Sequence, residues 1–138
     1  EIFRTHCAGL LACQSGEGLW HQLLDRNDSY LESSATAMFV YGFARGINRG
    51  WLDAKAYGPA ALLGWNALGT QINNIGQIEN VCVGTGVSYE PAYNYNRHVH
   101  PYTAHGYGPV LMAGSEMLAL LDGFDIRQST AIYFYDRK

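Results

Sequence analysis

The most chemically versatile side chains of this chain gather in one irregular stretch, residues 89–108. His98, His100 and His105 lie close together there, and Arg97 directly precedes them. A His-x-His pair places two imidazoles on one side of an extended segment, which suggests a metal site, but zinc usually takes three or four protein ligands. No cysteine and no carboxylate near the histidines completes such a set, so the sequence predicts neither a metal nor a cofactor.

His105 has a second interpretation, because it stands directly before a helix start flanked by Gly106 and Gly108. The free N–H groups and the positive dipole end of a helix N-terminus favour an anion such as a carboxylate. Arg97 could hold the same carboxylate through two parallel hydrogen bonds, while a role in bracing the loop is an equal alternative. Arg97, His105 and the adjacent Tyr107 are therefore candidate ligand-binding residues.

Three polar side chains have a structural interpretation that the sequence favours over a chemical one. Glu32 and Ser34 stand at an expected helix start, where they could bind ligand hydroxyl groups but more readily cap the helix. Glu116 is the single charge inside an apolar helical segment. We expect it to pair with an arginine or a backbone group rather than to act as an acid.

Composition limits the classes of protein to which the chain can belong. It has 138 residues, 48% of them apolar and 15% charged, which suffices for one globular core and is too short for two. A net charge of −3 lacks the positive field that phosphate-backbone binding needs, so nucleic acid is not an expected partner. No apolar run approaches the ~20 residues that cross a bilayer, so we expect a soluble protein with no membrane contact, in an undetermined compartment.

The cysteines and the first residues add two expectations. Cys7, Cys13 and Cys82 cannot all pair, and their spacing fits neither a zinc site nor a disulfide framework, so buried thiols are expected. The chain opens at Glu1 without an initiator methionine and without the layout of a signal peptide. It is therefore expected to be part of a longer polypeptide.

Helical periodicity predicts the first two helices. Apolar residues recur at helical spacing over residues 2–14 and again over 31–47. The second segment carries two apolar stripes at helical spacing, and these comprise Leu31, Ala35, Met38 and Gly42, and Ala37, Val40, Ala44 and Ile47. Two stripes on one helix require cover on more than one side, so this helix is predicted to be internal.

Two further helices are predicted later in the chain. Asp53 is a possible N-cap of the third, and Pro59 is expected either to kink that helix or to mark its true start. The fourth is predicted to begin with Pro109 in its first position and to end at Asp122-Gly123. Residues 77–83, between these helices, resemble a short strand.

These elements together predict an all-α fold. A β-prone tail, Thr130 to Tyr135, adds no more than a minor β-hairpin. About four main helices with long irregular loops do not match a simple four-helix bundle, whose connections are short. Helices that need cover on both sides are typical of an α/α barrel or solenoid, of which residues 1–138 are expected to form one domain. Apolar faces left uncovered predict self-association.

Three blocks of sequence resemble the C-terminal part of a known enzyme family. They are residues 18–25 (GLWHQLLD), 30–39 (YLESSATAMF) and 105–116 (HGYGPVLMAGSE). With the intervening Cys82-Val83-Gly84-Thr85-Gly86, their order and spacing resemble glycoside hydrolase family 105, the unsaturated rhamnogalacturonyl hydrolases, which are related to the unsaturated glucuronyl hydrolases of family 88. The resemblance covers most of residues 1–122.

The resemblance implies a portion of an (α/α)6 barrel that acts on the unsaturated uronic acid at the end of pectin-derived oligosaccharides. It implies that an aspartic acid protonates the C4=C5 double bond, that water adds at C5, and that the hemiketal opens to release the remaining sugar. The family's acid and its tryptophan- and arginine-rich block lie in the N-terminal half and have no counterpart here. We therefore expect no catalytic residue in this chain and no activity from it alone.

The resemblance also places Trp20 in a loop near the barrel mouth. A flat indole suits stacking on the C–H face of a sugar ring, although packing in the core is the favoured alternative. The uronate carboxylate of such an oligosaccharide is an anion that His105 and Arg97 could bind, with Tyr107 following His105 at the helix start. A different class of function stays open, namely a non-catalytic carbohydrate-binding or interaction module, or an isolated fragment without activity of its own.

Overall fold

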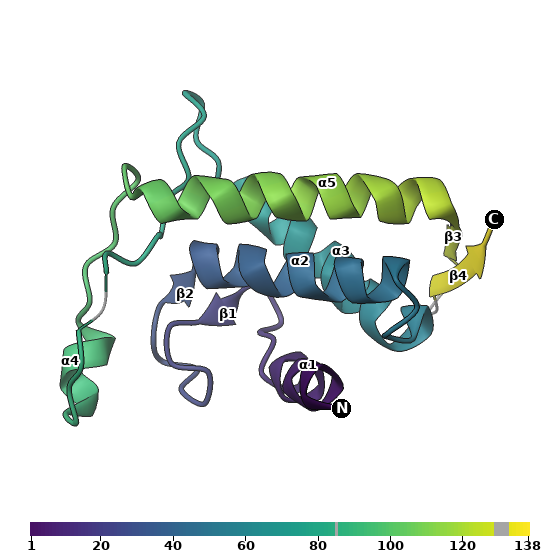
Figure 1. The fold of residues 1–138 in the computed structure, drawn as a ribbon. Coiled ribbons are helices and arrows are strands. Elements are labelled where there is room, and N and C mark those ends of the chain that lie inside the picture. The colour runs from purple at the N-terminus through teal and green to yellow at the C-terminus, as the bar shows by residue number, and fades with distance from the viewer. Residues whose placement is uncertain (85, 129–132) are drawn as a thin grey trace.

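The protein, described here by a computed structural model over residues 1–84, 86–128 and 133–138, consists mainly of helices (Figure 1). Its elements in chain order are α1 (Ile2–Ala12), β1 (Trp20–His21), β2 (Leu31–Glu32), α2 (Ser33–Asn48), α3 (Ala54–Thr70), α4 (Pro91–Tyr95), the 3-10 helix η1 (Ala104–Gly106), α5 (Tyr107–Gly123), β3 (Phe124–Gln128) and β4 (Tyr133–Arg137). The expected fold class, four main helices with a minor β-hairpin, is confirmed, and the short α4 is an addition.

Helix α2 lies at the centre of the helical layers. It packs along α5 on one side and along α3 on another, whereas α3 and α5 touch each other less. Helices α2 and α5 begin at the same end of the molecule, next to β2, and α3 runs in the opposite direction (Figure 1). The N-termini of α2 and α5, the two helices with the largest shared interface, therefore lie at the same end of the molecule. The connections at this end come from distant parts of the sequence.

The core forms where α2 faces these neighbours. Phe43 and Val40 are completely buried in α2, and Ala113 of α5 and Ala61 of α3 are equally buried. Each large apolar side chain that is buried contributes about 1.5–3 kcal/mol. Close approach of α3 depends on Gly64, because a Cβ atom there would lie only 2.7 Å from Cγ2 of Val40. Glycine at position 64 therefore lets α3 approach α2 closely enough for their side chains to pack in one layer.

The second apolar stripe of α2 is buried as expected, and the first is not. Ala37, Val40, Ala44 and Ile47 are each at most 1% exposed, whereas Met38 is 48% exposed. The prediction that α2 is internal and covered on more than one side is confirmed by its packing against α3 and α5. The expectation that the Met38 stripe is one of the covered faces is wrong, because α3 and α5 leave that side open. The expected start at Leu31 is also wrong, because Leu31 pairs with His21 in the β1–β2 ladder.

Helix α3 begins at Ala54, and the side chain of Asp53 caps it by accepting the Ala56 N–H at 3.0 Å. The N-cap prediction is confirmed. Pro59 lies inside the helix, so it does not mark the true start. Helix α5 begins at Tyr107, which places Pro109 in the third position rather than the first.

The connections hold less strand and more helix than expected. Residues 77–83 form no named strand and contribute only isolated bridges, Ile78 to Ile72 and Cys82 to Val99. The long stretch after residue 89 contains α4 and η1. The C-terminal hairpin is formed by β3 and β4 in antiparallel register, and residues 130–132 of the expected strand lie outside the described part of the chain.

Helix α5 presents a partly open apolar face. Leu111 is 75% exposed and Leu118 is 67% exposed. Apolar side chains of this size usually lie against another element, so this face has the composition of an internal one. Despite this, no helix in residues 1–84, 86–128 and 133–138 combines the length and apolarity required to cross a membrane.

A polar link joins α2 to α5 within this interface. Glu116 of α5 accepts a hydrogen bond from Nη1 of Arg45 at 2.5 Å and another from Nδ2 of Asn48 at 2.8 Å. Burial alone would raise the pKa of Glu116, but the hydrogen bonds from Asn48 and Arg45 and the charge of Arg45 hold it below its ordinary value of 4.5. The expectation that Glu116 serves as an internal partner of an arginine is confirmed.

Replacing Glu116 with glutamine should therefore destabilise the protein in a pH-dependent way. We expect a loss of about 1–3 kcal/mol at neutral pH, the range for hydrogen bonds to a charged group. Because the pKa of Glu116 is lower in the folded state, its contribution is present above the unfolded value and disappears as the pH falls through the folded value. The difference in melting temperature between wild type and Glu116→Gln should shrink below about pH 4.

Asp136→Asn is the matched control, because Asp136 pairs with Arg127 on the exposed hairpin, where the two side chains are 52% and 70% exposed. An exposed ion pair contributes about 0–1 kcal/mol. Equal destabilisation by the two substitutions would contradict the role assigned to Glu116.

Candidate functional site

Polar side chains gather at the end of the molecule where α2 and α5 begin. Two connections lie at this end, residues 22–30 between β1 and β2, and residues 79–84 and 86–106 between α3 and α5 (Figure 1). Arg97 and His105 lie on the second connection, and Tyr107 is the first residue of α5. The fold thus brings three of the four candidate residues to one end of the helical layers.

Glu32 is the central acceptor of this region. Its carboxylate caps α2 by accepting the Ala35 N–H at 2.5 Å, and it also accepts the Ser34 hydroxyl at 2.8 Å. A third donor comes from far along the chain, the N–H of Cys82 at 2.9 Å. The residue is only 2% exposed, and a buried carboxylate is stable only when such donors compensate the loss of water. The predicted capping role is confirmed.

The peptide of Cys82 connects Glu32 to His105. Its N–H binds the Glu32 carboxylate, and its carbonyl oxygen lies 2.9 Å from Nε2 of His105. The flanking residues pair with the histidine-rich stretch, since Val83 N–H donates to His98 O at 2.9 Å and His100 N–H donates to Val81 O at 2.8 Å. The segment around Cys82 therefore holds the N-terminus of α2 and the approach to α5 in one position.

This contact determines the tautomer of His105. A carbonyl oxygen can only accept, so Nε2 must carry the proton and Nδ1 of the neutral ring is an acceptor. Neutral His105 can therefore not donate to a carboxylate from Nδ1. Only the imidazolium form can donate from both nitrogens, one to Cys82 and one to a ligand. The side chain is exposed, so a ligand can reach it.

Arg97 is engaged by its own connection. Its guanidinium donates to the hydroxyl of Tyr93 at 3.2 Å and to the carbonyl oxygen of Gly84, and it lies over the Tyr93 ring at 5.0 Å from the centroid. These contacts match the bracing alternative. A guanidinium has five N–H donors, so two such bonds leave others for a ligand.

The remaining candidates have protein partners of their own. The hydroxyl of Tyr107 donates to Pro101 O at 2.8 Å, and Nδ1 of His100 accepts the Tyr102 N–H at 3.1 Å. His98 is exposed. In the part of the chain that the structure describes, no three His, Cys, Asp or Glu side chains are placed to hold a metal ion.

Trp20 lies in the core rather than on a surface. It is completely buried, its indole N–H donates to Leu10 O at 2.6 Å, and its ring meets Phe39 and Phe43 edge to face. An enclosed ring cannot stack on a sugar. The packing role that the sequence favoured accounts for all of these contacts, and stacking on a ligand would require a different conformation.

Two side chains next to Cys82 were not singled out by the sequence. Burial raises the pKa of Tyr30 well above its ordinary value, and the adjoining Cys82 thiol and Glu32 carboxylate add to the rise. Tyr30 is therefore a neutral phenol at physiological pH. Gln22 donates to the Cys82 sulfur at 3.5 Å. Both residues lie within the blocks 18–25 and 30–39, but the contact of Gln22 with a residue 60 positions away leaves no local pattern in the sequence.

The N-terminus of α5 carries no side-chain cap. At the same end of the molecule the Glu32 carboxylate caps α2, whereas no side chain among the described residues caps α5. Helix α5 continues directly from η1, so backbone carbonyls accept its first N–H groups: Gly106 N–H donates to Thr103 O at 3.0 Å, and Tyr107 N–H donates to Ala104 O. Among the described residues, no carboxylate caps the positive end of the dipole that η1 and α5 share.

A separate groove lies away from this region. Its volume is about 670 Å3, and it follows one face of α1, where Ile2, Leu10 and Cys13 line it together with Leu24. The groove is mainly apolar and contains no polar cluster like that around Glu32. It is the uncovered side of a helix and not a site of chemistry.

Comparison with known proteins gives the decisive observation. The profile of Glycosyl Hydrolase Family 88 matches residues 1–121. The chain belongs to this family. Among solved structures, a possible member of the GH105 family from Salmonella enterica serovar Paratyphi A superimposes with a TM-score of 0.79 at 28% identity and covers 83% of this chain. A family 88 glycosyl hydrolase from Bacteroides vulgatus gives 0.70 at 32% identity and also covers 83% of this chain.

Two curated relatives of this family 88 chain have names that describe an activity. An unsaturated 3S-rhamnoglycuronyl hydrolase from Formosa agariphila is 32% identical over 125 residues, which are 87% of this chain and 31% of the relative. A protein of the same name from an Alteromonas strain is 30% identical over 120 residues, 86% of this chain and 28% of the relative. The chain spans about a third of the length of these relatives, and 30% and 33% of the two structures. The expected fold, part of an (α/α)6 barrel, is confirmed.

Replacing Glu32 with glutamine should destabilise this end of the molecule. An amide cannot accept from all three donors, since its NH2 group would face one of the N–H or O–H groups that the carboxylate now accepts. An unsatisfied buried donor costs about 1–3 kcal/mol, so the melting temperature should fall by several degrees. Thermal unfolding followed by circular dichroism measures the change.

Ser34→Ala provides the graded control, because it removes one donor and leaves the carboxylate bound by Ala35 and Cys82. Its cost should be smaller, about 0.5–1.5 kcal/mol. An unchanged melting temperature for Glu32→Gln would mean that the carboxylate does not hold the Cys82 segment in solution.

Proposed function

We propose that this chain is the C-terminal part of a hydrolase that removes an unsaturated uronic acid from the end of rhamnogalacturonan- or pectin-derived oligosaccharides. Membership of family 88 supports the class of reaction, and the names of the Formosa and Alteromonas relatives support an unsaturated uronyl substrate. The proposed reaction is hydration. A proton adds to C4 of the C4=C5 double bond, water adds at C5, and the resulting hemiketal opens to release the remaining sugar.

The observation that carries the proposal is the uncapped N-terminus of α5 beside two cationic or ionisable side chains. A uronate carboxylate would complete this helix end as Glu32 completes α2 and Asp53 completes α3. His105 stands two residues before the first residue of α5, and Arg97 precedes it on the same connection. An anionic group of the substrate would therefore lie against the N-terminal end of α5, which lacks a carboxylate cap.

Each proposed binding residue has a definite chemical role. Arg97 offers the N–H groups that Tyr93 and Gly84 leave free. His105 in its imidazolium form offers Nδ1, while Nε2 stays on Cys82. Tyr107 fixes the approach through its bond to Pro101 and lies at the helix start. The proton donor is proposed to lie in the N-terminal half of the complete protein, outside residues 1–138.

The open apolar face of α5 and the groove of α1 fit the same proposal. In a complete barrel, other helices would cover Leu111 and Leu118 of α5 and Ile2 and Leu24 at the groove. Without that cover, a second copy of the chain offers the nearest apolar surface. We propose self-association through these faces for the separate chain.

The separate 138-residue chain should therefore be inactive and should not stay monomeric. Incubated with an unsaturated disaccharide, it should leave the ultraviolet absorbance of the C4=C5 bond unchanged, because no residue in it is proposed to protonate that bond. The complete protein should remove the absorbance. Light scattering should show oligomers of the separate chain. Turnover by the separate chain, or a stable monomer at high concentration, would contradict the proposal.

His105 gives a sharper test in the complete protein. His105→Ala should lower kcat/KM by roughly ten- to a hundredfold, the range for a hydrogen bond to a charged group. The melting temperature should stay nearly unchanged, because the contact proposed to be lost is made to the substrate and not within the protein. Rates are expressed per folded molecule, and melting temperatures are recorded in parallel.

His105→Gln is the matched variant, because its amide can still donate to Cys82 O but cannot become a cation. It should retain the melting temperature and lose kcat/KM as His105→Ala does, because its single nitrogen replaces Nε2 and leaves no donor at the position of Nδ1. If His105→Gln instead keeps wild-type kinetics, His105 only braces the connection. A complete protein that binds oligosaccharides without turnover would favour the carbohydrate-binding alternative.

A further inference from the structure

The β1–β2 connection and the residues leading into α4 enclose a hollow away from the contacts of Arg97 and His105. Its volume is about 250 Å3, and it is lined by Leu23, Asp25, Arg26, Tyr89, Pro91 and Asn94. We propose that this hollow is a subsite for one uncharged sugar ring of the oligosaccharide, beyond the unsaturated uronic acid. The link to the oligosaccharide rests on the proposed function, whereas binding of a sugar ring can be tested without it.

One wall of the hollow is apolar and unusually exposed. Tyr89 is 97% exposed, Pro91 is also exposed, and Leu23 is half-buried below them. An aromatic side chain normally buries most of its large surface. A flat aromatic ring beside an aliphatic one matches the C–H face of a pyranose, which would cover the tyrosine on binding.

The other residues that line the hollow carry side chains that can bind hydroxyl groups. Asn94 offers both a donor and an acceptor, Asp25 offers acceptors and Arg26 offers donors. Asp25 and Arg26 lie 3.8 Å apart, so their charges balance within the hollow. A uronate would meet the Asp25 carboxylate as well as the Arg26 guanidinium, so the balanced charge favours an uncharged ring.

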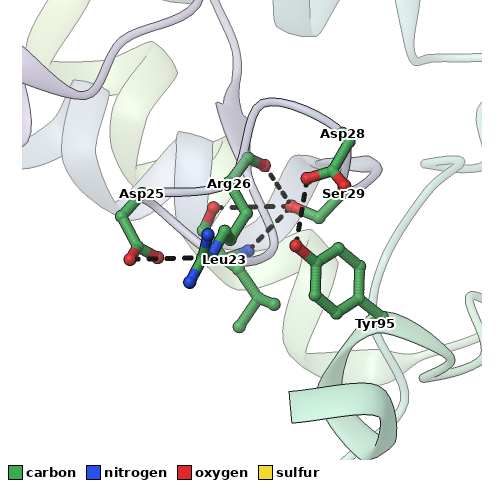
Figure 2. A network of polar contacts seen from close by, with 6 residues as sticks. All are labelled: Leu23, Asp25, Arg26, Asp28, Ser29 and Tyr95. Carbon is green, nitrogen blue, oxygen red and sulfur yellow. Dashed lines mark hydrogen bonds and ion pairs between the residues drawn. The ribbon is translucent and has the colours of Figure 1, made fainter.

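The two segments that line the hollow, the β1–β2 connection and α4, are held together by a polar network (Figure 2). The hydroxyl of Tyr95, on α4, points to Asp28 and donates to its Oδ1 at 3.0 Å, which ties α4 to the β1–β2 connection. Ser29 is 5% exposed and shapes that connection, because its hydroxyl accepts the Leu23 N–H at 3.1 Å and donates to Arg26 O at 2.8 Å. The hollow is thus formed before any ligand arrives.

Size and position limit what the hollow can take. Pockets for drug-sized ligands are about 300–1,000 Å3, so 250 Å3 suits a single ring. Helix α4 also carries Tyr93, which contacts Arg97 at 3.2 Å. One short helix therefore borders both the hollow and the proposed uronate-binding residues, which is the arrangement that successive units of one chain require.

The test uses methyl α-L-rhamnopyranoside as an uncharged probe and the complete protein, with binding followed by saturation-transfer NMR. Wild type should bind the probe saturably in the millimolar range. Tyr89→Ala should raise the Kd by roughly five- to tenfold, as expected for the loss of an aromatic contact. Tyr102→Ala is the matched control, because Tyr102 is 71% exposed on the same connection and does not line the hollow.

The subsite and the proposed hydrolase function can be tested separately, because the binding measurement requires no turnover. Retention of binding in Tyr102→Ala together with its loss in Tyr89→Ala supports the subsite. Circular dichroism confirms that both variants are folded, and Tyr89→Phe should restore binding by restoring the ring. Absence of saturable binding to wild type, or equal Kd values for wild type and Tyr89→Ala, would overturn the subsite. If the protein still hydrolyses an unsaturated disaccharide in that case, the proposed function stands without it.

Discussion

The buried carboxylate of Glu32 is the interaction on which the polar end of this molecule depends. Glu32 is only 2% exposed, and its buried carboxylate is tolerated only because three donors bind it. Each donor has a different structural role: the Ala35 N–H lies in the first turn of α2, the Ser34 hydroxyl fixes the orientation of the carboxylate, and the Cys82 N–H belongs to a remote segment. The carboxylate is therefore both a helix cap and a tertiary contact, and the position of the Cys82 segment follows from it.

The α2–α5 interface is fixed by polar contacts at two levels. Near the N-termini, the Cys82 peptide bridges Glu32 and His105. Further along the helices, Glu116 receives Arg45 and Asn48. Apolar packing between them supplies most of the free energy but little directional information, whereas hydrogen bonds to charged groups define the register of the two helices.

The main helices, the caps at Asp53 and Glu32, and the pairing of Glu116 could be predicted from the sequence, because each depends on neighbours within a few turns or on a single buried charge. The Met38 stripe was misassigned because its burial depends on where α3 and α5 pack, which periodicity does not reveal. Trp20 could be read both ways, and only the tertiary position of Phe39 and Phe43 distinguishes a core indole from a sugar-binding one. The link from Glu32 to Cys82 joins residues 50 positions apart and leaves no local pattern.

The separation of 50 residues between Glu32 and Cys82 also affects the order in which contacts form during folding. A contact across 50 residues requires closure of a long loop, and the entropy of closure must be met before the hydrogen bond contributes. Helices α2 and α3 are adjacent in sequence and can pack early, so the Cys82 segment and α5 reach Glu32 only afterwards. Interactions that form late slow unfolding more than they speed folding. The Glu32 carboxylate is therefore expected to slow unfolding of the polar end more than it speeds folding.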